Sequence, residues 1–93
     1  MYATIRRYEN NEGLADRLAA RSDEIQSLMS AVDGFRAYHL LRSNDGTASI
    51  TVCDDQAGTE ETNRLAASWL RENMPDAVSA APQVTAGEVV IDF

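Results

Sequence analysis

The chain has 93 residues, of which 44% are hydrophobic and 25% are charged, and this is the composition of one globular domain spanning residues 1–93. A net charge of −7 and a pI near 4.4 argue against nucleic acid and anionic membrane surfaces as partners, because both need a basic face. A single cysteine, Cys53, excludes a disulfide within the chain. The N-terminus lacks an apolar leader, and no apolar run approaches membrane-spanning length, which predicts a cytoplasmic location.

The first predicted elements are a strand and a long helix. Residues 2–8 are rich in aromatic and β-branched side chains, which is typical of a strand. Asn10 to Gly13 interrupts this pattern. Apolar residues then recur at helical spacing from Leu14 to Val32, with Ser22 standing where an apolar residue would complete the stripe. One continuous helix is therefore expected, and Gly34 is available for a left-handed conformation at its end.

A hairpin is the next expected element. Residues 35–42 and 47–54 both have strand-like composition, and Ser43-Asn44-Asp45-Gly46 between them is a strong turn sequence. In the second of these strands, Ile50 and Val52 alternate with more polar residues. The pattern indicates two antiparallel strands in which alternate side chains lie on opposite faces.

A second helix and a last strand complete the chain. Asp54 or Asp55 can cap a helix over residues 56–73, and Met74-Pro75 ends it. The final strand is expected over residues 84–93. The order βαββαβ predicts an α+β, ferredoxin-like fold with an antiparallel sheet and two helices on one face.

The first strand raises the question of what covers the second face of the sheet. Ala3 and Ile5 share one face and are expected to meet the helices, whereas Tyr2, Thr4, Arg6 and Tyr8 share the other. This second set is too aromatic to be left exposed and too polar for an ordinary core. A second copy of the sheet packed against it would explain the mixture, so the sequence predicts a homodimer.

Four stretches carry a family resemblance: TIRRYE, VDGFRAYHLLR, NDGTASITVCDD and EETNRLAASWLRENMP. With them the chain resembles the antibiotic biosynthesis monooxygenase-like (ABM) domains of the dimeric α+β barrel superfamily. The resemblance implies a homodimer whose two sheets face each other and form a barrel with internal cavities. Family members include cofactor-free oxygenases of aromatic polyketides, haem-degrading enzymes and proteins with no known activity, so the fold alone does not choose among them.

The resemblance also suggests site residues. Haem-degrading members use an asparagine near the end of the first strand, a tryptophan on the second helix and a histidine after it. Trp69 matches, but Arg6 and Arg7 occupy the strand positions and residues 76–80 contain no histidine, which argues against haem degradation. Polyketide oxygenases use Asn, Trp and Tyr. Asn63 and Trp69 match, although six residues along a helix place them about 120° apart.

Candidate ligand-binding residues are thus Tyr2, Tyr38, Asn63 and Trp69, and candidate catalytic residues are Arg6, Tyr8 and His39. Trp69 is also suited to plain core packing. Arg6 could bind an enolate, carboxylate or quinone oxygen while Tyr8 donates a hydrogen bond. Its structural alternative is an ion pair across the dimer with an acidic residue such as Glu88.

The orientation of His39, the only histidine, depends on the hairpin loop. A loop of two or four residues places it on the face of Ile50 and Val52, expected to meet the helices. A loop of three or five residues places it beside Ser49 and Thr51 in the cavity. It could serve as a base or proton relay, as a haem ligand, or only as a structural residue.

Two functions remain open at the level of sequence. The first is a cofactor-independent monooxygenase acting on small aromatic or polyketide-like compounds. The second is a non-catalytic dimeric module that binds a small hydrophobic ligand or has a stress-related role. One histidine and one cysteine cannot assemble a metal site, and no glycine-rich phosphate loop is present, so no tightly held cofactor is expected.

Overall fold

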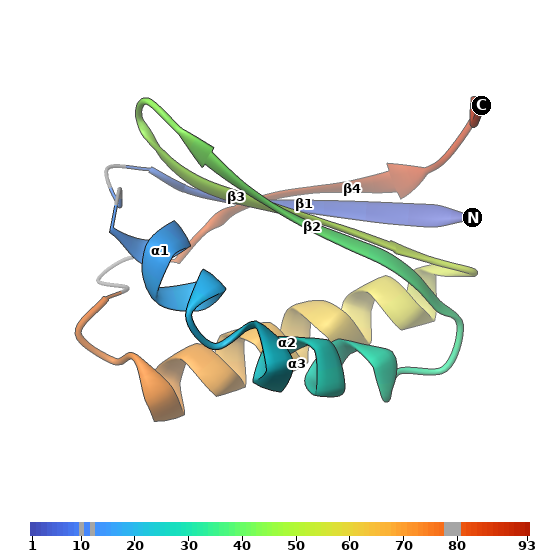
Figure 1. Ribbon diagram of the computed structural model, residues 1–93. Coiled ribbons are helices and arrows are strands. Elements are labelled where there is room, and N and C mark those ends of the chain that lie inside the picture. The colour runs from blue at the N-terminus through green and yellow to red at the C-terminus, as the bar shows by residue number, and fades with distance from the viewer. Residues whose placement is uncertain (10, 12, 78–80) are drawn as a thin grey trace.

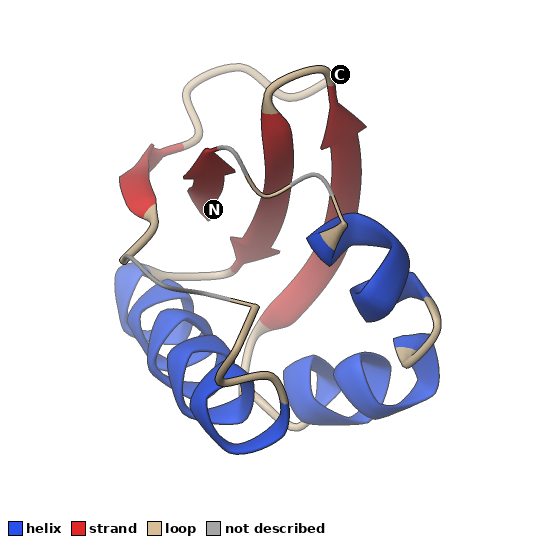
Figure 2. Cartoon of the chain, turned by 90° about the vertical axis from the view of Figure 1, so that its left-hand side faces the viewer, coloured by secondary structure: helices blue, strands red, loops and turns tan. Residues whose placement is uncertain are grey.

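The structure, a computed structural model, describes residues 1–9, 11, 13–77 and 81–93. The described elements are, in chain order, β1 (Tyr2–Glu9), α1 (Leu14–Ala19), α2 (Ser22–Ser30), β2 (Phe35–Ser43), β3 (Gly46–Cys53), α3 (Gln56–Asn73) and β4 (Gln83–Glu88). The strands form one antiparallel sheet in the order β2-β3-β1-β4. All the helices lie on one side of it, with α2 and α3 next to each other (Figures 1 and 2). The ferredoxin-like α+β arrangement predicted from the sequence is confirmed.

The first helical region differs from the prediction, because it is two helices and not one. The break falls at Arg21, whose φ of −120° and ψ of 33° lie outside the helical range. Arg21 and Ser22 are the polar residues that interrupt the apolar stripe, so no apolar contact holds the chain straight there. Asp23 and Glu24 lie in the first turn of α2, where carboxylates are favoured by the helix dipole.

Of the remaining helix signals, the Asp55 cap is confirmed. The Asp55 side chain accepts a hydrogen bond from the Gly58 backbone N–H at 2.9 Å, which caps α3. Gly34 has the expected positive φ of 80°, but α2 already ends at Ser30, so this glycine forms the turn into β2 and does not cap the helix. The last strand is shorter than predicted and ends at Glu88, after which the Val89 N–H donates to the Met1 carbonyl at 2.9 Å. The predicted breaks at Asn10 and Glu12, and part of the connection before β4, lie outside the described residues.

The hairpin has a two-residue loop, and this fixes the register of the sheet. Ser43 lies opposite Gly46, which leaves Asn44 and Asp45 as the loop. Gly46 has a φ of 151°, and a Cβ built there would lie 2.2 Å from the Tyr8 carbonyl oxygen, so a larger residue does not fit. In this register His39 lies opposite Ile50.

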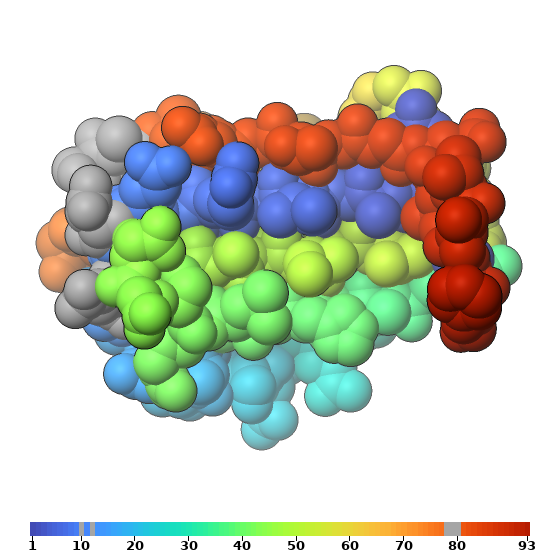
Figure 3. Space-filling model, turned by 90° about the horizontal axis from the view of Figure 1, so that it is seen from above, coloured from blue at the N-terminus to red at the C-terminus, as the bar shows by residue number. Residues whose placement is uncertain are grey.

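The two faces of the sheet are reversed relative to the prediction. Thr4, Arg6 and Tyr8 lie under the helices and are buried, with exposed fractions of 0, 3 and 6%. Ala3 and Ile5 lie on the opposite face, which no helix covers (Figures 1 and 3). Strand alternation had grouped these residues correctly, but alternation by itself does not indicate which group meets the helices.

The core is therefore built mainly by the helices. Its buried members are Tyr8, Leu14, Leu18, Ile25, Met29, Ala66, Leu70 and Met74, and only Tyr8 belongs to a strand. The sheet contributes buried polar side chains to the same layer, namely Thr4, Arg6, Thr47, Ser49 and Thr51. Among the described residues, no helix combines the length and apolar character needed to cross a membrane. The interior of the described chain thus combines an apolar core with a polar layer on the inner face of the sheet.

Candidate functional site

The centre of the candidate site is Arg6, a buried arginine in the middle of the sheet. It lies on β1 between Ser49 of β3 and Val84 of β4. Its side chain turns toward α3, where Nη1 donates a hydrogen bond of 2.7 Å to Oδ1 of Asn63. Thr4, two residues earlier on the same face, also bonds to the Asn63 side chain, with 3.1 Å between Nδ2 and the threonine hydroxyl. Asn63 thus positions the guanidinium from the helix side.

Arg6 has no carboxylate partner within the described residues. The five ion pairs found there belong to other arginines, at positions 17, 21, 36, 42 and 64. The Nε atom of Arg6 is buried and makes no hydrogen bond in this part of the chain. An arginine stays protonated in proteins, and the effective cost of burying a charge is several kcal/mol. The site therefore holds a positive charge that the surrounding side chains do not neutralise.

Two tyrosines lie near this charge. Burial raises the pKa of the Tyr8 phenol, and the positive charge of Arg6 opposes that rise. Burial likewise raises the pKa of Tyr38, on β2, and Arg6 again acts in the opposite direction. Because burial dominates at both residues, the two phenols stay protonated at neutral pH. They can donate hydrogen bonds but cannot act as bases there.

A large cavity opens beside Arg6 between β1, β4 and α3; we call it the outer cavity. Its volume is about 710 Å³, and it opens to solvent. Arg6, Tyr8, Asn63 and Arg71 form its polar lining. The rest of the lining is apolar and consists of Ala67, Leu70, Met74, Pro75, Ala81, Pro82 and Val84. This mixture of apolar walls and a few polar groups is typical of small-molecule sites.

A second, much smaller void lies on the other side of Arg6; we call it the inner cavity. It measures about 20 Å³, which is enough for about one water molecule. Arg6, Tyr8 and Trp69 all line it, together with Tyr38 and Ser49. Trp69 does not line the outer cavity. The three residues therefore meet around a space too small for an aromatic ligand, whereas the outer cavity is lined by Asn63 in place of Trp69.

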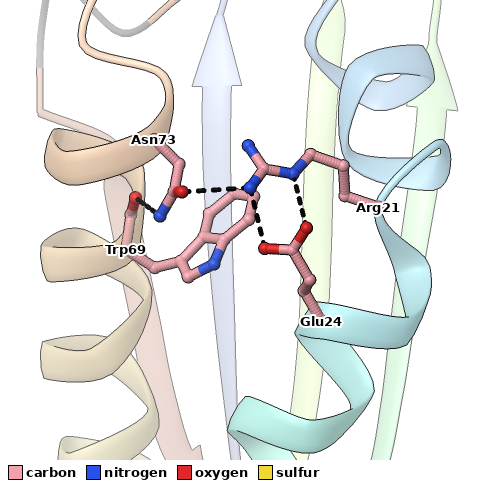
Figure 4. A network of polar contacts seen from close by, with 4 residues as sticks. All are labelled: Arg21, Glu24, Trp69 and Asn73. Carbon is pink, nitrogen blue, oxygen red and sulfur yellow. Dashed lines mark hydrogen bonds and ion pairs between the residues drawn. The ribbon is translucent and has the colours of Figure 1, made fainter.

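Trp69 is held in place by a polar network that joins α2 to α3 (Figure 4). The Arg21 guanidinium lies 4.8 Å from the centre of the indole ring, a distance typical of a cation–π contact. Arg21 also donates to Glu24 at 2.8 Å and to Oδ1 of Asn73 at 3.0 Å, and Asn73 donates to the Trp69 carbonyl at 2.9 Å. Hydrogen bonds from Arg21 hold the pKa of Glu24 below its usual value. The network covers the indole ring on its α2 side.

The remaining predicted site residues do not reach Arg6. His39 is exposed and shares the open face with Ile50, as a two-residue loop requires, but this face is not the one under the helices. Tyr2 lies at the far end of β1, opposite Cys53 and Glu88, and lines neither cavity. Because this chain's own helices cover Arg6, the predicted ion pair across a dimer is not supported.

Several residues around the site were not predicted from the sequence. Leu70, Met74 and Val84 form cavity wall, and Ser49 lines the inner cavity. One signal was present in β3, where Thr47, Ser49 and Thr51 place three hydroxyl groups on the face opposite Ile50 and Val52. Those hydroxyl residues, together with Thr4 and Arg6, mark the polar face of the sheet. Arg21 gave no comparable signal, because its contact with Trp69 joins two separate helices.

Comparison with known proteins was informative only at the level of structure, since no family model and no curated protein matches the chain. A variant of MhuD with two manganese protoporphyrin IX molecules bound per active site is 18% identical, with a TM-score of 0.75 over 100% of this chain and 98% of that chain. A candidate antibiotic biosynthesis monooxygenase from Bordetella bronchiseptica is 14% identical, with a TM-score of 0.73 over 97% of each chain. A dimeric ferredoxin-like protein from an uncultured marine organism is 15% identical, with a TM-score of 0.61 over 99% of this chain and 96% of that chain.

The chain has the antibiotic biosynthesis monooxygenase-like fold. This ABM-like domain does not, however, offer a histidine to a haem iron in its cavities. His39 is the only histidine of the sequence, and it lies on the open face of the sheet. Among the described residues, no group of His, Cys, Asp and Glu side chains is arranged to hold a metal ion. The likeness to a porphyrin-binding structure therefore extends to the fold and not to a histidine ligand.

Proposed function

We propose that this protein is a cofactor-independent monooxygenase of small aromatic or polyketide-like compounds, and that the outer cavity is its active site. The observation that carries the proposal is Arg6, a buried and unneutralised guanidinium at an apolar cavity of about 710 Å³. Such a charge stabilises an oxyanion far more strongly than water-exposed groups do. Asn63 positions the guanidinium through a 2.7 Å hydrogen bond.

In the proposed reaction, the enolate of the substrate lies with its oxygen near Arg6. Tyr8 lines the same cavity as a neutral phenol and donates a hydrogen bond to that oxygen. The electron-rich enolate carbon reduces dioxygen and forms a hydroperoxide with it. Loss of water from this hydroperoxide converts the CH₂ group of the substrate to C=O, so that CH₂ and O₂ yield C=O and H₂O. The apolar walls lower the local polarity around the buried guanidinium and so strengthen its interaction with the oxyanion.

A second function, non-catalytic binding of a small apolar ligand, is favoured by one specific observation. No His, Asp or Glu lines the outer cavity within the described part of the chain, so no side chain there is suited to take the proton of a substrate. In the enzymatic reading, the substrate must therefore acidify through its contact with Arg6. In the binding reading, Arg6 only holds a ligand anion.

An oxygen-consumption assay separates the two functions. Purified protein would be mixed with anthrone, whose CH₂ group oxidises to a carbonyl, and the rate compared with that of anthrone in buffer alone. The enzymatic function predicts protein-dependent oxygen uptake that falls at least tenfold in Arg6→Leu and is unchanged in Arg7→Leu. Arg7 is the matched control, because it is the adjacent arginine and lies exposed on the open face. Uptake equal in all proteins and buffer favours the binding module.

We further infer that two copies associate through the open face of the sheet. This face carries Ala3, Ile5, Ala48, Ile50, Val52 and Leu41, of which Leu41 is 46% exposed. Arg7 and His39 are exposed on the same face. Exposed apolar patches accompanied by polar residues are typical of interaction sites. One of the structurally similar proteins is described as a dimeric ferredoxin-like protein. In this arrangement the outer cavity, on the helix side of the sheet, belongs to each subunit separately.

A further inference from the structure

We propose that the outer cavity selects compounds in which a carboxylate stands next to an enolic or phenolic hydroxyl, and that Arg6 binds the carboxylate. This inference rests on the proposed function for the location of the site. It goes beyond that function because it names a permanent charge on the ligand. It also assigns Arg6 to the carboxylate of the ligand and Tyr8 to the adjacent hydroxyl.

The first step is the charge of the cavity. Arg6 is 3% exposed, and the Asn63 amide that accepts its 2.7 Å hydrogen bond is neutral. The second charged residue of the lining, Arg71, is also an arginine, and no acidic residue lines the cavity within the described part of the chain. In a protein with a net charge of −7, a cavity lined only by positive charges is selective for anions.

The second step is the kind of anion. A carboxylic acid with a pKa near 4 is almost fully ionised at neutral pH, whereas only about one in a thousand phenols with a pKa near 10 is ionised. A guanidinium that is already buried needs a partner with a permanent negative charge, which the carboxylate supplies and the phenol does not. A phosphate would bring a second negative charge into a cavity whose remaining walls are largely apolar, with only Arg71, an exposed residue, as a second cation.

The third step is the group next to the carboxylate. Tyr8 lines the cavity together with Arg6, two residues away on the same face of β1. Its phenol is neutral at pH 7, because burial raises its pKa, and so it can donate to a neighbouring oxygen of the ligand. An aromatic ring that carries both groups on adjacent carbons would face both side chains at once. The enolate oxygen of the proposed reaction would then stand next to the carboxylate, beside the same guanidinium. The apolar body of the ligand would then contact Leu70, Met74 and Val84.

Isothermal titration with four related naphthalenes tests the proposal: 3-hydroxy-2-naphthoate, its methyl ester, 2-naphthoate and 2-naphthol. We expect 3-hydroxy-2-naphthoate to bind at least tenfold more tightly than its ester and 2-naphthol, and more tightly than 2-naphthoate. In Arg6→Leu the acid and the ester should bind equally, whereas Arg7→Leu should keep the full difference. Tyr8→Phe should remove only the advantage of 3-hydroxy-2-naphthoate over 2-naphthoate.

Three results would overturn the proposal. One is equal binding of the acid and the ester to the wild-type protein, and another is no binding of any of the four probes at millimolar concentration. The third is a preference for the acid that persists in Arg6→Leu, since the preference would then come from Arg71 or from the surface. Should Arg6→Leu not fold, Arg6→Lys takes its place, and a reduced but retained preference for the acid is then expected.

The outcome is distinguishable from failure of the proposed function. Selective binding of the acid without any oxygen uptake would refute the oxygenase while supporting carboxylate recognition. Oxygen uptake with equal affinity for acid and ester would support the oxygenase and overturn carboxylate recognition. The titration measures binding alone and the oxygen electrode measures turnover alone, so neither result depends on the other.

Discussion

The two faces of the sheet have opposite character. Each is the reverse of what is usual for a sheet that is covered by helices on one face and exposed to water on the other. The face under the helices carries Thr4, Arg6, Ser49 and Thr51, all nearly or completely buried. The open face carries Ile5, Ile50, Val52 and other apolar residues, which remain partly exposed. A sheet with one solvated face ordinarily places its apolar side chains inward and its polar side chains outward.

This distribution is unfavourable for the stability of a single chain, and we therefore propose that the outer face associates with a second copy and that the inner face binds a ligand. An apolar outer face is stable in water only when something covers it, and a second copy of the same face does so by symmetry. A polar inner face is costly, because buried polar groups need partners. Its position beside a cavity of about 710 Å³ is the basis for the proposed ligand site.

The largest effect is expected when a charge is placed on the open face. Ile50→Asp puts an unpaired carboxylate into the proposed interface, which should cost about 3–5 kcal/mol and weaken association more than 100-fold. Size-exclusion chromatography with light scattering would follow the change. Ser27→Asp, at an exposed position of α2, is the control and should leave association unchanged. A variant with Ile50→Asp that associates like the wild type would contradict the role of this face.

The next effect concerns the turn that decides which residues share a face. Gly46→Ala should destabilise the chain by about 2–4 kcal/mol, because of its positive φ and the close Tyr8 carbonyl. Gly87→Ala is the matched control in β4, where a Cβ meets nothing within 4 Å, and should change stability by less than about 1 kcal/mol. Urea unfolding measures both. Equal effects of the two substitutions would show that the turn does not constrain the register.

A smaller effect is expected from removing the buried charge. No carboxylate of the described residues pairs with Arg6, so Arg6→Leu leaves no buried negative charge without a partner. The free energy of unfolding should therefore be unchanged or raised by up to about 3 kcal/mol, despite the lost bond to Asn63. Arg64→Leu, which breaks only an exposed ion pair with Glu61 on α3, should change it by less than about 1 kcal/mol. Urea unfolding without ligand tests both variants. A loss of 3 kcal/mol or more in Arg6→Leu would mean that a carboxylate pairs with Arg6 after all.

The smallest effect is a loss of stability in alkali. The pKa values of Tyr8 and Tyr38 are raised by burial, so above pH 10 the unfolded chain releases these protons before the folded chain does. Stability is fully present below pH 10 and falls as the pH rises, by at most about 1.4 kcal/mol per pH unit for each phenol. The sequence has no lysine, which leaves few other groups to titrate there.

Denaturant unfolding between pH 8 and 11 would measure this slope. Tyr8→Phe should flatten it, and Tyr38→Phe should do so as well, because burial raises the pKa of both phenols. The pKa of the Cys53 thiol is also raised by burial and adds a slope of the same sign in every variant, so only the difference between variants reports on Tyr8. An identical slope in wild type and Tyr8→Phe would show that the phenol does not resist ionisation.

The sequence was sufficient for those parts of the fold that local signals determine. The limits of α3 follow from the Asp55 cap and Pro75, and the hairpin follows from its Asn-Asp-Gly turn. The location of Arg6 and Tyr8 on the same face of β1 follows from the alternation of side chains along a strand. The face on which they lie could not be deduced, because alternation is symmetric and the usual rule places apolar residues under the helices. That rule does not hold for this sheet, whose aliphatic side chains Ile5, Ile50 and Val52 lie on the open face.

Contacts between residues that lie far apart in the sequence could not be predicted either. Arg6 and Asn63 are 57 residues apart, and nothing in either segment indicates that their side chains meet. The grouping of Asn63 with Trp69 in one site was suggested by resemblance, yet the two lie at different cavities. The break at Arg21 separated α1 from α2 and brought its guanidinium to Trp69. These are properties of the packed chain.

We propose that the open apolar face is a subunit interface and that the polar inner face forms a ligand site within each subunit. Sedimentation of the wild-type protein at micromolar concentration tests it most directly. A particle of about 20 kDa, twice the chain mass of 10.2 kDa, is the predicted result. A homogeneous monomer of about 10 kDa at that concentration would contradict the account, because the apolar face would then stand uncovered in water.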